Sequence, residues 1–105
     1  MTKVSFFKAN GLFTGFSLTG HSTVSCGDDE GRLLCSAVSS AAYMTVNTLT
    51  DVIRAQAEIK VDDGLMDVRL LSKADACQVL LEGFYIHMEQ LSRQYPDNVK
   101  IITEV

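Results

Sequence analysis

The sequence contains no tryptophan, a single proline and no apolar run longer than a few residues. A membrane-spanning helix needs about 20 consecutive apolar residues, so we do not expect the chain to cross a membrane. The first lysines flank only a short apolar patch, and no longer apolar stretch of the kind found in a secretory signal follows. We therefore expect a cytoplasmic protein with no membrane partner.

Cysteines are also few: the chain has Cys26, Cys35 and Cys77, an odd number with no CxxC pair. A disulfide scaffold is therefore not expected, because such scaffolds use even sets of cysteines. A metal site is not expected either, because too few potential ligands cluster together. No cofactor is predicted.

Basic residues are outnumbered: nine Lys and Arg against thirteen Asp and Glu give a formal charge of −4. Non-specific nucleic-acid binding draws most of its affinity from a basic face, so no direct nucleic-acid contact is expected. A length of 105 residues, 47% of them hydrophobic, suffices for one core and is too short for two. We expect one domain over residues 1–105.

The first half of the chain predicts a β-hairpin, a loop and a helix. Residues 4–8 and 12–18 have the alternating pattern of strands and flank the turn signal Asn-Gly at 10–11. Residues 22–32 are polar, acidic and contain two glycines, which predicts a mobile loop. From Leu34 to about Ala57 apolar residues recur at three-to-four spacing, which predicts a helix.

The second half predicts another hairpin and helix. Alternating segments flank the Asp-Gly turn signal at 63–64. Ser72 or Asp75 is expected to cap a helix that Pro96 ends. Residues 98–105 alternate again as a last strand.

This order of elements, ββαββαβ, indicates the α+β class. One mixed or antiparallel sheet with both helices on one face satisfies the apolar stripes of the helices and the alternation of the strands. The other face of the sheet would be partly exposed, which makes self-association an expectation.

Cys35 lies at the first turn of the first predicted helix. Unpaired backbone N–H groups and the helix dipole favour an anion there, which lowers the pKa of a thiol. The residues that follow, among them Ser36 and Ser39, are small and would let a substrate backbone approach the sulfur. The amides of the helix start are candidate donors to an oxyanion.

His21 ends the second predicted strand beside Gly20, which permits a sharp exit and the close passage of another chain. An imidazole within reach of Cys35 would accept the thiol proton and later protonate an amine leaving group. Taken alone, a cysteine near a helix start is usually a small buried hydrophobe, and a lone histidine after a strand is more often a solvent-facing loop residue. The residues themselves leave both alternatives open.

The stretches "TGHS" and "LLCSAVSS" resemble the bacterial ribosomal-processing cysteine protease (Prp) family. The pattern of that family is a Gly-His pair, a flexible loop, and a hydrophobic pair leading into Cys-small-small-x-Ser. The matching positions here are Gly20, His21, Leu33, Leu34, Cys35, Ser36, Ala37 and Ser39. Chain length and element order agree as well, so the resemblance covers essentially the whole chain.

The resemblance implies an α+β homodimer and a cysteine endopeptidase with His21 and Cys35 as its catalytic dyad. Gly20, Ser36 and Ser39 are the corresponding substrate-binding residues. The implied substrate is the N-terminal extension of a large-subunit ribosomal protein whose tail lies near the peptidyl-transferase centre. Family members remove that extension at a Phe-containing site during ribosome maturation.

One position departs from the family pattern. Many members have an Asp three residues before the Cys, where this chain has Arg32. Asp28 or Asp29 is the candidate acid orienter from a shifted position, or no carboxylate assists. A Cys–His pair works without such an acid, with less control over the histidine tautomer.

Three further residues complete the prediction. Cys77 falls on the apolar stripe of the second helix and is expected in the core, while His87 lies on a polar flank of that helix. Cys26 is a candidate redox-sensitive neighbour of the dyad. A thiol redox enzyme would need Cys26 to resolve Cys35. The main alternative function is a non-catalytic, ribosome-associated protein that binds peptides or assists assembly on the same scaffold.

Overall fold

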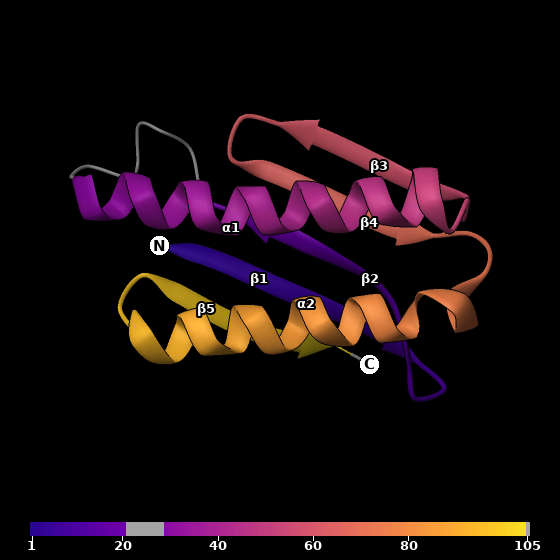
Figure 1. The fold of residues 1–105 in the computed structure, drawn as a ribbon. Coiled ribbons are helices and arrows are strands. Elements are labelled where there is room, and N and C mark those ends of the chain that lie inside the picture. Colours follow the sequence, from indigo (N-terminus) through magenta and orange to yellow (C-terminus); the bar gives the residue numbers. More distant parts are fainter. Residues whose placement is uncertain (21–28, 105) are drawn as a thin grey trace.

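The computed structural model describes residues 1–20 and 29–104, without the side chains of residues 29 and 30 (Figure 1). The elements follow one another as β1 (Thr2–Ala9), β2 (Leu12–Thr19), α1 (Asp29–Asn47), a π-helical segment η1 (Thr48–Val52), β3 (Ala57–Asp62), β4 (Leu65–Leu70), α2 (Ala74–Gln94) and β5 (Val99–Glu104). The predicted order ββαββαβ is confirmed. No helix in the described part of the chain is long and apolar enough to cross a membrane.

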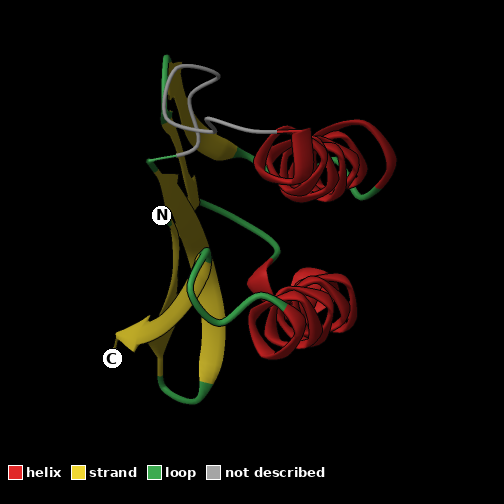
Figure 2. Cartoon of the chain, turned by 90° about the vertical axis from the view of Figure 1, so that its left-hand side faces the viewer, coloured by secondary structure: helices red, strands yellow, loops and turns green. Residues whose placement is uncertain are grey.

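The five strands form one mixed sheet in the order β3-β4-β2-β1-β5. All neighbours are antiparallel except β1 and β5, which run parallel with Thr2 opposite Val99. Both helices lie on one face of this sheet (Figure 2), as the alternation of the strands and the stripes of the helices predict. The parallel pair sets the start of β5 beside the start of β1, and its end, Glu104, opposite Phe7.

The first hairpin closes through a turn that its sequence dictates. Asn10 and Gly11 both adopt positive φ, 54° and 78°. Asn and Gly are the residues that reach this left-handed region at least cost, and such turns match the twist of the adjoining strands. The predicted hairpin is therefore confirmed, with strands that extend one or two residues further than the pattern indicated.

Phe6 stands at the centre of the core that the helices and the sheet enclose. Its side chain is fully buried, and its ring centroid lies 5.6 Å from that of Phe84 and 5.0 Å from that of Tyr85. Burying a ring of this size contributes about 2–3 kcal/mol. These contacts fix α2 against β1 and so hold the position of the neighbouring strands.

The opposite face of the sheet is open and mostly polar. Because Val4 and Phe6 are buried beneath the helices, the alternate residues of β1, among them Lys3, point to the open face. Phe7 lies there beneath the guanidinium of Arg69, whose Cζ is 3.7 Å from the ring centroid. The predicted partial exposure of this face is confirmed.

The boundaries of the first helix differ from the prediction at both ends. Residues 29–32 were expected in the loop but form the first turn of α1. Acidic residues at a helix start are favoured by the helix dipole, so Asp29 and Glu30 suit this turn despite their polarity. At the other end, η1 ends at Val52 and Arg54 takes a φ of 64°, so the helix stops short of Ala57.

The capping prediction for the second helix is wrong. The N-cap of α2 is Lys73, with a φ of 55° and no capping hydrogen bond from its side chain. The Ser72 hydroxyl instead accepts a hydrogen bond of 2.9 Å from the backbone N–H of Gln56. Asp75 lies inside the first turn of α2. Tertiary contacts thus outweigh the local capping preference.

Candidate active site

Cys35 lies in the second turn of α1, half-buried, next to the buried Leu34. The prediction placed Cys35 in the first turn, but α1 begins earlier, at Asp29. The unpaired N–H groups of a helix belong to its first four residues. The expected donation to an oxyanion from helix-start amides beside Cys35 is therefore not what this geometry provides.

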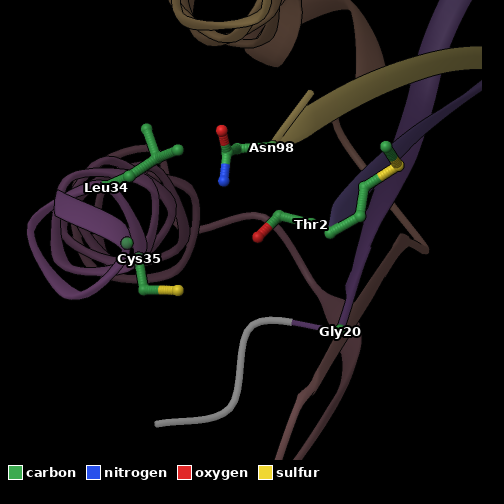
Figure 3. Close-up of a pocket in the computed structure, with 7 residues that line it drawn as sticks. Thr2, Gly20, Leu34, Cys35 and Asn98 are labelled. Carbon is green, nitrogen blue, oxygen red and sulfur yellow. The ribbon is translucent and has the colours of Figure 1, made fainter. Parts of the chain in front are cut away.

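The Cys35 side chain lines a pocket of about 30 Å³ between α1 and the ends of three strands (Figure 3). The lining residues are Met1, Thr2, Gly20, Gly31, Leu34, Cys35 and Asn98. We call this the Cys35 pocket.

Strand pairing explains how such distant residues meet. The parallel register of β1 and β5 sets Thr2 opposite Val99, and the backbone N–H of Thr2 donates a 2.7 Å hydrogen bond to the carbonyl of Asn98. The antiparallel register of β1 and β2 sets Lys3 opposite Thr19. The start of β1, the end of β2 and the start of β5 therefore lie at the same end of the sheet, beside Cys35.

Gly20 leaves β2 with a φ of 83°, a conformation that residues with a side chain rarely adopt. A Cβ at this position would lie 2.4 Å from the carbonyl oxygen of Met1, which is closer than atoms can approach. The N–H of Gly20 donates a 2.9 Å hydrogen bond to the carbonyl of Gly64. The sharp exit predicted for Gly20 is confirmed, and the close passage of another chain stays a prediction.

Thr2 and Asn98 are pocket residues that the sequence did not indicate. Thr2 is only 4% exposed, while Asn98 is exposed in the turn before β5. Figure 3 shows the Asn98 side chain extending toward α1 between Leu34 and Thr2, with the Thr2 hydroxyl pointing toward the same space. The two residues lie near opposite ends of the chain, and no local pattern links them.

The two serines predicted to bind substrate occupy different faces of α1. Ser39 follows Cys35 by one helical turn and is half-buried, so it lies on the same side of the helix. Ser36 is exposed to solvent. Neither belongs to the lining of the Cys35 pocket.

Most of the remaining predicted site residues lie in or beside the part of the chain that the structure does not describe. His21, Cys26 and Asp28 lie outside the described residues. Asp29 is the first residue of α1, and the structure describes its backbone but not its side chain. Arg32, where the family resemblance predicts an acid, is exposed in the first turn of α1.

Cys35 is disulfide-bonded in this structure. A single bond at Cys35 is not a disulfide scaffold, so the prediction against such a scaffold is not contradicted. Cys77 is the free cysteine among the described residues. The thiolate is the nucleophilic form of cysteine, so attack by Cys35 requires reduction first.

Cys77 is fully buried in the core, as its position on the apolar stripe predicted. Burial raises the pKa of its thiol, and the nearby Lys73 ammonium partly opposes that shift. His87 lines a separate apolar groove between α1 and α2, together with Met44 and Phe84. Among the described residues, no group of three or more His, Cys, Asp or Glu side chains is placed to hold a metal ion.

A model of the family described as "Cysteine protease Prp" matches residues 1–100. Among solved structures, SMU.848 from Streptococcus mutans is 27% identical, with a TM-score of 0.86 over 99% of each chain. No curated protein matches the sequence.

Two structures of the ribosomal processing protease Prp from S. aureus are also similar. One is a complex with a substrate peptide, 18% identical with a TM-score of 0.88. The other is a complex with a covalently linked product peptide, 19% identical with a TM-score of 0.83. Each match covers 99% of this chain and 100% of the other. These likenesses show a shared fold of five strands and two helices.

Proposed function

Because this chain belongs to the cysteine protease Prp family, we propose that it is an endopeptidase with Cys35 as nucleophile and His21 as general base and acid. The observation that carries this proposal is the pocket beside Cys35. Its wall includes Gly20, the residue directly before His21 in the sequence. A pocket at the sulfur gives a peptide carbonyl a path to the nucleophile.

In the proposed reaction, His21 takes the proton of the reduced Cys35 thiol, and the thiolate attacks the peptide carbonyl carbon. A carbon–sulfur bond forms and the carbonyl oxygen becomes an oxyanion. The carbon–nitrogen bond then breaks, and His21 gives its proton to the leaving amine. Water, deprotonated by His21, hydrolyses the thioester, which releases the acid product and restores the thiol. The product peptide linked covalently to the S. aureus protein supports this course.

The proposed substrate is the N-terminal extension of a large-subunit ribosomal protein, the one whose tail lies near the peptidyl-transferase centre. Support comes from the S. aureus relative, a ribosomal processing protease solved with a substrate peptide. We propose that Gly20, Ser36 and Ser39 contact this peptide. Asp28 or Asp29 is the proposed acid that orients His21.

We also propose that the protein acts as a homodimer in the cytoplasm. The cytoplasm keeps thiols reduced and would convert the disulfide-bonded Cys35 of this structure into the reactive thiol. In the cytoplasm the protein would then be in its reduced, active form.

The test uses reduced protein and a peptide that spans the extension junction of the ribosomal protein from the same genome. Wild type and Cys35→Ala are incubated with the peptide, and the products are followed by mass spectrometry. We expect cleavage at one site by wild type and none by Cys35→Ala. Intact peptide with the reduced wild type would overturn the protease proposal.

The same experiment separates the protease from a non-catalytic peptide-binding or assembly protein. Binding is measured by fluorescence anisotropy of a labelled peptide. Equal binding by wild type and Cys35→Ala, without cleavage by either, would favour the binding protein. Cleavage by wild type, with binding alone by Cys35→Ala, supports the protease.

A further inference from the structure

The proposed attack on a peptide bond requires hydrogen-bond donors to the oxyanion, and the start of α1 does not supply them beside Cys35. As the carbonyl oxygen gains charge, hydrogen-bond donors must face it. The amides of α1 that lack helical partners belong to the first turn, whereas Cys35 is in the second. The candidate donors are therefore polar groups that line the Cys35 pocket opposite the sulfur.

Thr2 presents an unusual hydroxyl in that position. The residue is 4% exposed, and its Oγ1 makes no hydrogen bond with any residue that the structure describes. Buried polar groups nearly always have a hydrogen-bond partner. The hydroxyl points into the Cys35 pocket (Figure 3), so a ligand there would satisfy it.

Asn98 presents a second polar group to the same space. Its backbone is fixed on both sides: the N–H donates to the Tyr95 carbonyl at 3.0 Å, and the carbonyl accepts from the Thr2 N–H at 2.7 Å. The carboxamide itself makes no hydrogen bond within residues 1–20 and 31–104. Because its backbone is anchored and its carboxamide N–H groups are available as donors, the Asn98 side chain is well suited to orient a ligand.

This inference rests on the proposed function and names residues that would serve it. We propose that Thr2 and Asn98 hold the main chain of the peptide substrate across the pocket from Cys35. The Asn98 amide donates to the carbonyl oxygen that Cys35 attacks, and the Thr2 hydroxyl bonds an adjacent main-chain group.

The chemistry of the pocket selects the main chain over a side chain. Both groups are uncharged, and together they offer donors and acceptors, which match the C=O and N–H groups of a peptide.

The test compares single substitutions in the reduced protein. Asn98→Ala removes the carboxamide and Thr2→Val removes the hydroxyl, while Thr2→Ser retains a hydroxyl. Matched controls are Asn47→Ala and Thr103→Val. Asn47 and Thr103 are exposed, and the Asn47 side chain makes no capping hydrogen bond. Circular dichroism and thermal melts verify that each variant is folded.

We expect Asn98→Ala to lower kcat/KM about 100-fold, mainly through kcat, because the donor acts on developing charge. Thr2→Val should lower kcat/KM about tenfold, mainly through KM, because a neutral hydrogen bond positions the ground state. Thr2→Ser should restore most of that loss, and both controls should stay within about twofold. If the two residues had only a structural role, the loss of activity would parallel the loss in melting temperature. It would not appear mainly in kcat for one variant and mainly in KM for the other.

Peptide binding in the Cys35→Ala background separates failure of this inference from failure of the proposed function. If wild type cleaves but Asn98→Ala and Thr2→Val match the controls, the inference is overturned and the protease stands. If wild type does not cleave, the protease is overturned. Weaker binding with the added Thr2→Val change would then still support the pocket as a peptide site, and unchanged or absent binding would overturn it.

Discussion

Cys35 and Cys77 lie on the two helices that cover one face of the same sheet, yet their surroundings are opposite. Cys77 is in the first turn of α2, fully buried, with a pKa that burial raises. Cys35 is a turn further into α1, half-buried, and lines a pocket with Thr2 and Asn98. The cysteine nearer to a helix start is thus the one removed from solvent.

The comparison separates two influences on a thiol. A helix start favours the thiolate, but removal from water disfavours it, and at Cys77 the second effect dominates. Access to a pocket with polar walls is what distinguishes Cys35. We therefore expect the surroundings of the sulfur in the folded chain to affect its reactivity more than its place along a helix does.

The largest expected contrast is in catalysis. Cys35→Ala should lower kcat/KM about 10,000-fold or more, because the nucleophile is lost. Cys77→Ala should leave kcat/KM within about threefold, because a buried residue away from the pocket contributes packing. Steady-state cleavage of the junction peptide measures both. A comparable loss in the two variants would break the comparison.

The redox state provides the next contrast. Protein prepared without reductant, with Cys35 disulfide-bonded as in this structure, should cleave at background level. Dithiothreitol should restore activity, because it frees the thiolate that attacks. Cys77→Ala should show the same dependence on reductant. Full activity of the oxidised protein would exclude Cys35 as the nucleophile.

Alkylation should distinguish the two thiols directly. In the reduced, folded protein, iodoacetamide should modify Cys35 within minutes. Cys77 should react at least about 1,000-fold more slowly than in the unfolded chain, because it becomes accessible only on opening of the core. Peptide mapping by mass spectrometry reports each site. Equal labelling rates in the folded state would contradict the burial difference.

For stability we expect the larger effect at Cys77 and the smaller effect at Cys35. Cys77→Ser places a hydroxyl at a fully buried position and should lower the free energy of unfolding by about 2 kcal/mol. Cys35→Ser, measured under reducing conditions, should change it by less than about 0.5 kcal/mol, because the position is partly solvated. Urea denaturation with reductant measures both values. A larger loss for Cys35→Ser would disagree with the structure.

The smallest expected effect is on alkaline stability. Burial raises the pKa of Cys77 in the folded state, so the contribution of its neutral thiol is complete below the pKa of the unfolded thiol, about 8.5. As pH rises from there through the folded pKa, the unfolded state ionises first and stability falls. Wild type should lose stability over this interval more steeply than Cys77→Ala. Parallel urea titrations at successive pH values measure the difference.

Much of the fold follows from local patterns in the sequence. The Asn-Gly turn at 10–11, the alternation of the strands and the stripes of the two helices each correspond to an element of the structure. The boundaries were harder to predict, because residues 29–32 resemble a loop in composition and are helical in the fold. Likewise Ser72, a good cap by type, bonds Gln56 instead.

By itself, the sequence determined the order of the elements, the core position of Cys77 and the resemblance carried by Gly20 and Cys35, since these depend on residue type and short spacing. Only the tertiary structure decided which residues face Cys35. Thr2 and Asn98 meet there because β1 and β5 pair in parallel. Strand pairing is a long-range interaction, and no local pattern at either end of the chain encodes it.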